Sequence, residues 1–162
     1  MTAISPEFLR EALPFVLLAV LLYTLAKKDL GRTHAPRFSG SQEQWVAAGI
    51  GLVIGFYDGF FGPGTGSFLV FLFVRLLGYD FLSASAAAKL GNTATNISAL
   101  ALFIAKGHIW WHFVVAMATA NVLGSLLGTR LALKHGTGFV RGVFLLVVSA
   151  LIFKTSFDAF SL

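Results

Sequence analysis

Six apolar runs, separated by short polar connectors, constrain this chain more than any other feature of its sequence. Hydrophobic residues make up 57% of the 162 residues and charged residues only 12%, which is too little charge to cover a soluble domain of this size. The sequence therefore predicts an all-α membrane protein of about six helical segments, forming a single membrane domain over residues 1–162. Ser83 is the expected N-cap of the fourth segment. The runs cover residues 8–26, 45–61, 67–77, 84–105, 109–133 and 139–157.

Charged residues in the connectors predict the orientation of the chain in the membrane. The connector at residues 27–44 carries four cations against two acids, and residues 130–141 carry three cations and no acid. Cytoplasmic connectors of membrane proteins are rich in Lys and Arg, so both are expected in the cytoplasm. The net charge of +5 is explained by these orientation signals, and no nucleic-acid-binding face is predicted.

The stretch YDGFFGPGTGS, residues 57–67, interrupts this pattern with a carboxylate, four glycines and a proline. Gly59 and Pro63 are expected to break the helix. The first, fourth, fifth and sixth runs are long enough to cross a bilayer, but the third is too short. The second and third runs are therefore expected to form a broken Gly-Pro-Gly hairpin whose tip lies at membrane depth.

Irregular backbone is tolerated at membrane depth only where it is buried in protein or lines a wet cavity. Transporters bind their substrates at broken helices of this kind. The open backbone N–H groups and the N-terminus of the third run would form a binding site for a small anion. The predicted contacts in the tip are Gly62, Gly64, Thr65, Gly66 and Ser67.

Two ionisable residues lie within the predicted spans. Asp58 would couple transport to protons or act as a gate, or else would cap the exposed amides of the glycine turn. Lys89 would attract and neutralise the anion, or else would snorkel toward the cytoplasmic edge. Asn92, Thr93 and Asn96 follow Lys89 on the same helix face, so they extend the predicted substrate site or else bond to other helices.

The fifth run carries two further patterns. Asn121, Gly124 and Gly128 are interpreted mainly as a small-residue face for helix packing, with Asn121 a weaker candidate for the site. His108 and His112 have the spacing of two metal ligands on a helix, but no third ligand is evident, and no metal site is predicted. The chain has no cysteine and no catalytic motif, so neither a cofactor nor enzyme activity is expected.

Two segments together resemble a known family. GFYDGFFGPGTGSF, residues 55–68, and AKLGNTATNISALALFIAKGHIWW, residues 88–111, are similar in order and spacing to the sulfite exporter TauE/SafE family of membrane permeases. The resemblance covers essentially the whole chain. It implies a multi-pass permease of the bacterial inner membrane that exports sulfite, sulfonates or related organic or sulfur anions. The residues leave open whether Asp58 couples this transport to protons or the chain is a channel without proton coupling.

Members of that family have two related halves, each opening with a glycine-rich broken helix. This chain resembles the second half only, as a fragment or as a half-size relative. The resemblance therefore implies that a second copy or a first-half repeat completes the translocation path. The alternative is a non-transporting membrane subunit that assembles with a partner chain.

Overall fold

A computed structural model describes residues 6–60, 62–105 and 111–160. These residues form five α-helices and one π-helical turn, and no strand occurs among them, which confirms the all-α class. The elements are α1 (Pro6–Ala26), α2 (Ser41–Phe60), α3 (Thr65–Leu72), η1 (Phe73–Leu77), α4 (Phe81–Ala105) and α5 (Trp111–Phe160).

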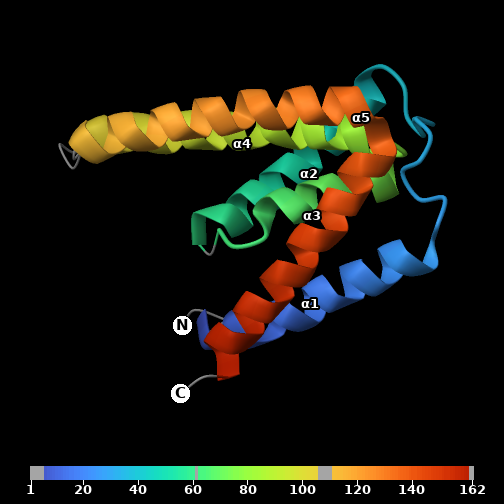
Figure 1. Cartoon of the computed structure of the whole chain (residues 1–162), viewed down its shortest axis with the longest axis horizontal. Coiled ribbons are helices and arrows are strands. Elements are labelled where there is room, and N and C mark those ends of the chain that lie inside the picture. Colours follow the sequence, from blue (N-terminus) through green and yellow to red (C-terminus); the bar gives the residue numbers. More distant parts are fainter. Residues whose placement is uncertain (1–5, 61, 106–110, 161–162) are drawn as a thin grey trace.

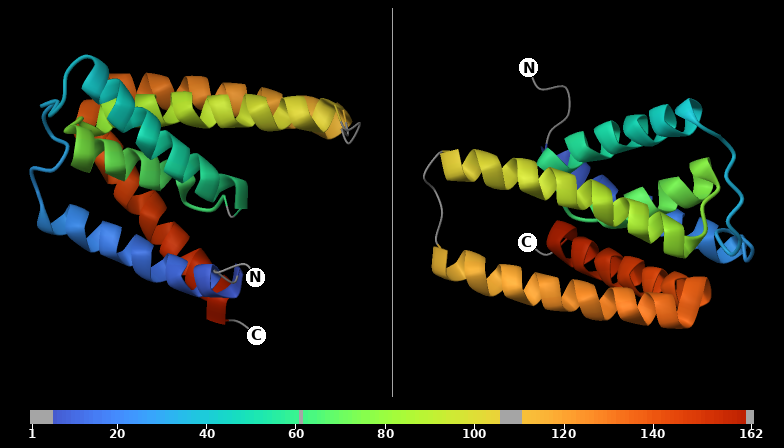
Figure 2. Two further views of the ribbon diagram at one scale, coloured as in Figure 1. Left: turned by 180° about the vertical axis from the view of Figure 1, so that it is seen from behind. Right: turned by 90° about the horizontal axis from the view of Figure 1, so that it is seen from above.

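The helices form three tiers (Figure 1). In the first tier, α4 and the first part of α5 run antiparallel to each other, and the views in Figure 2 agree on this. In the second, α2 and α3 lie side by side and are joined at residues 62–64. In the third, α1 packs along the second part of α5. The depth of the α2–α3 turn in a membrane stays a prediction.

The fifth and sixth predicted runs belong to one helical element, α5. Between these two runs the helix breaks at Gly136, with φ 72° and ψ −166°. Glycine adopts a positive φ without the steric penalty that a Cβ would bring. The break turns the second part of α5 away from α4 and leads it past α3 to α1 (Figure 1).

The short third run forms α3 and η1, which supply much of the buried core. Leu69, Phe73 and Leu77 along this segment are all nearly inaccessible to solvent. The segment ends at Gly78, where φ is 79° and an added Cβ would lie 2.2 Å from the carbonyl oxygen of Ala35. Glycine is therefore needed to let the connector after α1 pack beneath the end of η1.

The helix α4 begins at Phe81, three residues before the predicted run. The prediction that Ser83 is the N-cap of this helix is wrong. The carboxylate of Asp80 caps the helix, because it accepts bonds from the Ser83 backbone N–H at 2.9 Å and from the Ser83 hydroxyl at 2.7 Å. The cap therefore lies in the connector, and Ser83 is inside the first turn.

In the described part of the chain, one helical segment is long and apolar enough to cross a membrane by composition, Met117–Ala159, and it contains the break at Gly136. The apolar stretch of α1, Glu11–Ala26, is shorter than this criterion requires. Large apolar side chains are nevertheless exposed on α1, α2, α4 and α5. These side chains form a surface that lipid or another chain would cover.

Candidate functional site

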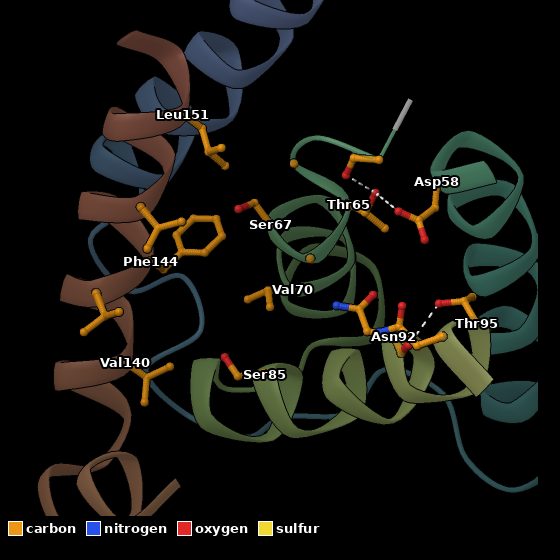
Figure 3. Close-up of a pocket in the computed structure, with 16 residues that line it drawn as sticks. Asp58, Thr65, Ser67, Val70, Ser85, Asn92, Thr95, Val140, Phe144 and Leu151 are labelled. Carbon is orange, nitrogen blue, oxygen red and sulfur yellow. Dashed lines mark hydrogen bonds between the residues drawn. The ribbon is translucent and has the colours of Figure 1, made fainter. Parts of the chain in front are cut away.

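The break between α2 and α3 is organised by Asp58 and Thr65. Asp58 lies near the end of α2, and its Oδ1 accepts a hydrogen bond from the Thr65 hydroxyl at 2.7 Å (Figure 3). The same hydroxyl is 2.8 Å from the carbonyl oxygen of Gly62. A partner of the carboxylate is thus a side-chain hydroxyl, whereas the sequence predicted backbone amides. Through Thr65, Asp58 ties the end of α2 to the start of α3.

Gly62 and Gly64 give the break its shape, whereas Gly59, which was also predicted to break the helix, lies inside α2. Gly62 and Gly64 have φ of 72° and 85°, which residues with a Cβ rarely adopt. Gly64 precedes the first residue of α3, and its carbonyl oxygen accepts a hydrogen bond from the Phe68 backbone N–H at 3.0 Å. The Tyr57 hydroxyl donates to the carbonyl oxygen of Pro63 at 2.7 Å, which fixes the break from the side of α2.

A cavity of about 490 Å³ lies against this break (Figure 3). One wall is polar and comes from the end of α2, the break, α3 and α4. The facing wall is apolar and comes from the second part of α5, including Val140, Phe144 and Leu151. The side chains and glycines of the polar wall are Asp58, Gly62, Gly64, Thr65, Gly66, Ser67, Ser85, Asn92, Thr95 and Asn96.

The polar wall depends on a close approach of α3 to α4. A Cβ added to Gly66 would lie 3.4 Å from Nδ2 of Asn92. Glycine in the first turn of α3 therefore lets the Asn92 amide reach the broken end of the helix. Thr65 and Ser67 on either side of Gly66 are buried. The structure thus brings the predicted tip residues together with Asn92 and Asn96.

Lys89 occupies a neighbouring cavity. Its Nζ donates to the Thr129 hydroxyl of α5 at 3.0 Å, a contact that the sequence analysis missed. The second cavity, about 860 Å³, lies between α4 and the first part of α5. Lys89 lines it but does not line the first cavity. The residues that line both cavities are Gly66, Val70, Ser85, Asn92 and Asn96.

The sequence of this chain has counterparts among known proteins. The sulfite exporter TauE/SafE family model matches residues 1–155. This chain belongs to the sulfite exporter TauE/SafE family. No solved structure matches it.

Curated relatives of this TauE/SafE chain are named as probable membrane transporters. The probable membrane transporter protein YfcA of Escherichia coli K12 is 35% identical over 157 residues, which cover 96% of this chain and 57% of the relative. A probable membrane transporter protein of Haemophilus influenzae is 33% identical over 159 residues, covering 96% and 60%. The ORF9 protein of Sinorhizobium, also so named, is 32% identical over 157 residues, covering 97% and 59%.

The chain therefore spans between 57% and 60% of the length of these relatives. Membership of a transporter family makes it an integral membrane protein and not an enzyme. The exposed apolar side chains on its long helices agree with this, since lipid is an apolar solvent.

The remaining predicted residues of the TauE/SafE chain have mixed outcomes. Asn121 lines the second cavity together with Thr93. Gly124 and Gly128 are exposed, and no described residue lies within 4 Å of a Cβ added at either, so the predicted packing is not made within the described part of the chain. His108 and the side chain of His112 lie outside the described residues.

A polar junction that the sequence analysis missed holds the connector before α4. His34 Nδ1 is 3.0 Å from Asp80 Oδ2, and Asp80 is buried. Burial would raise the pKa of Asp80, but hydrogen bonds from Ser83 and from the Leu82 backbone, together with His34, lower it below 3.8. Nearby, Tyr79 donates to Glu43, which with burial raises the pKa of Tyr79 to about 12.

Arg141 makes a separate connection between α5 and the end of α1. Its guanidinium donates to the carbonyl oxygen of Thr24 at 2.7 Å, to that of Lys27 at 3.1 Å and to that of Lys28. Thr24 is in the last turn of α1, whose carbonyls lack partners within the helix, and Lys27 and Lys28 directly follow it. A cation there also interacts favourably with the helix dipole. Arg141 thus fixes the end of α1 to α5, beyond the break at Gly136.

Proposed function

We propose that this chain is a membrane permease, or the substrate-binding half of one, for small anions of the sulfite and sulfonate type. The observation that carries the proposal is the cavity between the broken α2–α3 turn and α4. Hydroxyls and amides gather there at a helix break, the kind of place at which transporters bind substrates. The apolar wall from α5 lowers the local dielectric constant and strengthens polar contacts to an anion.

Neutral donors would bind the oxygen atoms of the anion. Ser67, Asn92 and Asn96 line the cavity and can each donate at least one hydrogen bond. The backbone N–H groups at the start of α3 would contribute a further positive end. An oxyanion with several acceptor atoms matches such a set of donors. Family membership favours sulfite, sulfonates and related anions over other solutes.

Lys89 would supply the positive charge. Its side chain lines the adjoining cavity, and its ammonium group bonds to Thr129. Asn92 and Asn96 line both cavities, so an anion held by these amides is within reach of a flexible lysine side chain. We propose that Lys89 leaves the neutral Thr129 hydroxyl and pairs with the anion, because an ion pair is much stronger than a neutral contact in a membrane interior.

Asp58 would couple anion movement to a proton. It lines the same cavity as the proposed anion donors, and an ionised carboxylate there repels an anion. Protonation removes this repulsion. The rival is a channel without proton coupling, in which Asp58 only holds the break through Thr65.

We further propose that a second copy or a chain equivalent to a first-half repeat covers the cavities. Lys89, Thr93, Asn96 and Asn121 are exposed on α4 and α5. Polar side chains are costly against lipid and usually face a protein interior or a cavity. In this arrangement the chain is multi-pass in a bacterial inner membrane, and residues 27–44 lie in the cytoplasm. A non-transporting subunit would present the same exposed polar face.

The test is flux of radiolabelled sulfite, methanesulfonate and acetate in proteoliposomes that contain the purified chain. The proposal predicts flux of a sulfur anion that is driven by a pH gradient. Asp58→Asn is expected to abolish this flux. Flux that ignores the pH gradient would favour the channel. Flux that appears only when a partner chain is reconstituted would assign this chain to a half-permease. An absence of flux with and without the partner would favour the non-transporting subunit.

A further inference from the structure

A third cavity, about 490 Å³, lies where the end of α1, the following connector and η1 meet. It shares no lining residue with the two cavities described above. It is therefore a separate candidate site, and a ligand could bind there whether or not the chain transports anions. Its lining residues are Tyr23, Ala26, Lys27, Lys28, Asp29, Leu30, Arg37 and Arg75.

The cavity is strongly cationic. Four of its lining residues are Lys or Arg and one is Asp. The Asp29 carboxylate is paired with Arg32, at 3.7 Å, outside the cavity lining. Within the residues that the structure describes, no carboxylate pairs with any of the four lining cations. The cavity therefore has an unbalanced positive charge that suits a phosphate group.

The guanidinium of Arg75 is held in place at one side of the cavity. Arg75 comes from the π-helical turn, is half-buried, and its guanidinium lies 5.6 Å from the centre of the Tyr23 ring. Stacking of this kind holds a guanidinium in place and leaves its edge N–H groups free to donate. Lys27 and Lys28 are exposed and more flexible. The site thus combines one positioned cation with several that can adjust.

The cavity also adjoins an apolar helix surface. Leu18, Leu22 and Leu25 are exposed on α1 and are spaced by four and three residues, so they lie on one face. The stripe ends three residues before Lys28. In an integral membrane protein, the end of an apolar helix followed by cations is where lipid headgroups lie.

We propose that this cavity binds the phosphate headgroup of an anionic phospholipid. The headgroup contacts Lys27, Lys28 and Arg75, and the acyl chains lie against Leu22 and Leu25 of α1. Basic pockets between membrane helices bind acidic headgroups by this combination of charge and apolar contact. A bound lipid would hold α1 to η1 across the connector.

Native mass spectrometry of the full chain in detergent tests this proposal, with phosphatidylglycerol and phosphatidylcholine of identical acyl chains as probes. The wild-type chain is expected to prefer phosphatidylglycerol. Each cation removed from the cavity is expected to lower the affinity for that lipid ~5-fold. The variants are Lys27→Gln/Lys28→Gln and Lys28→Gln/Arg75→Gln, and the first keeps the stacking on Tyr23 intact. The control, Arg130→Gln/Lys134→Gln, removes the same charge from α5 outside the cavity.

The proposal requires that the cavity variants lose the preference and that the control keeps it. Equal affinity of the wild-type chain for the two lipids would overturn it. An equal loss in the control would overturn it too, since attraction would then come from overall charge. A third arm adds inorganic phosphate in large molar excess. Retained phosphatidylglycerol supports a lipid site, whereas complete displacement assigns the cavity to a free anion and contradicts the proposal.

Discussion

The Thr65 hydroxyl donates a hydrogen bond to the Asp58 carboxylate at 2.7 Å, across the break between α2 and α3. A hydroxyl has one proton to donate, and the Gly62 carbonyl oxygen, 2.8 Å away, is its second available acceptor. When Asp58 is ionised, the charged acceptor is preferred. Protonation of Asp58 weakens that preference and lets Thr65 turn to Gly62. The pair would therefore link the proposed proton at Asp58 to the conformation of the break.

Thr65→Val tests the structural half of this link. The substitution keeps the shape of the side chain but removes the donor to a charged acceptor, which costs about 1–3 kcal/mol in the free energy of unfolding. Denaturant titration in detergent measures the change. The matched control is Thr155→Val, because Thr155 is buried and its hydroxyl donates only within its own helix. A similar loss of unfolding free energy in both variants would mean that the contact with Asp58 stabilises the chain no more than a hydrogen bond within one helix.

Gly64→Ala is expected to destabilise the chain by about 1–2 kcal/mol, since an alanine is strained at a positive φ. Its Cβ would also lie 3.3 Å from Cε2 of Phe68. Gly59→Ala provides the comparison, because Gly59 is in α2 and an added Cβ meets nothing within 4 Å. The midpoint temperature of thermal unfolding should fall for Gly64→Ala and rise slightly for Gly59→Ala. A tolerated Gly64→Ala would show that the break is built differently.

Asp80→Asn is expected to lower the free energy of unfolding at neutral pH by about 1–3 kcal/mol. The pKa of Asp80 is lowered in the folded chain. Its stabilising contribution is therefore complete above the unfolded pKa of ~3.9 and is lost as the pH falls through the folded pKa. Measured from about pH 3 to pH 7, the free energy of unfolding should fall less steeply with decreasing pH in the variant than in the wild-type chain.

Asp29→Asn is the control for this experiment. Asp29 is an exposed carboxylate in the connector that carries His34, the partner of Asp80, and its ion pair with Arg32 is long, 3.7 Å. Exposed pairs contribute at most ~1 kcal/mol. If Asp29→Asn reduces the acid dependence of the free energy of unfolding as much as Asp80→Asn does, the role given to the buried carboxylate is contradicted.

Arg141→Gln should loosen the end of α1, because it removes the guanidinium that bonds to Thr24, Lys27 and Lys28. Hydrogen exchange measured by mass spectrometry is expected to become faster in peptides that cover residues 24–32. The free energy of unfolding should fall by about 1–3 kcal/mol. Arg130→Gln removes an exposed arginine from the same helix and is expected to change neither measurement. Unchanged exchange in Arg141→Gln would refute the clamp.

Local patterns in the sequence predicted much of this fold. The apolar runs located the helices, the glycine-proline stretch located the break, and the polar stripe placed Asn92 and Asn96 on one face of α4. Each of these depends on residues within a few turns of one another. The cap of α4 differs from the prediction. Ser83 stands next to the apolar run, but Asp80, three residues earlier, caps the helix.

Contacts between distant segments could not be predicted in this way. Lys89 meets Thr129, which is 40 residues away in sequence. Their pairing depends on the register of α4 against α5. Apolar periodicity does not set that register in a membrane protein, because lipid-facing and protein-facing surfaces are both apolar. Arg141 and the end of α1 are likewise joined over 113 to 117 residues.

Equilibrium binding of radiolabelled sulfite to the purified chain in lipid nanodiscs tests the proposed anion site most directly, because it does not require a complete translocation path. We predict saturable binding that Lys89→Gln weakens about 10- to 100-fold, as expected for the loss of a charge-assisted contact. Lys134→Gln, which removes an exposed cation of α5, should bind sulfite as the wild-type chain does. No saturable binding, or equal binding by Lys89→Gln and the wild-type chain, would contradict the proposed anion site.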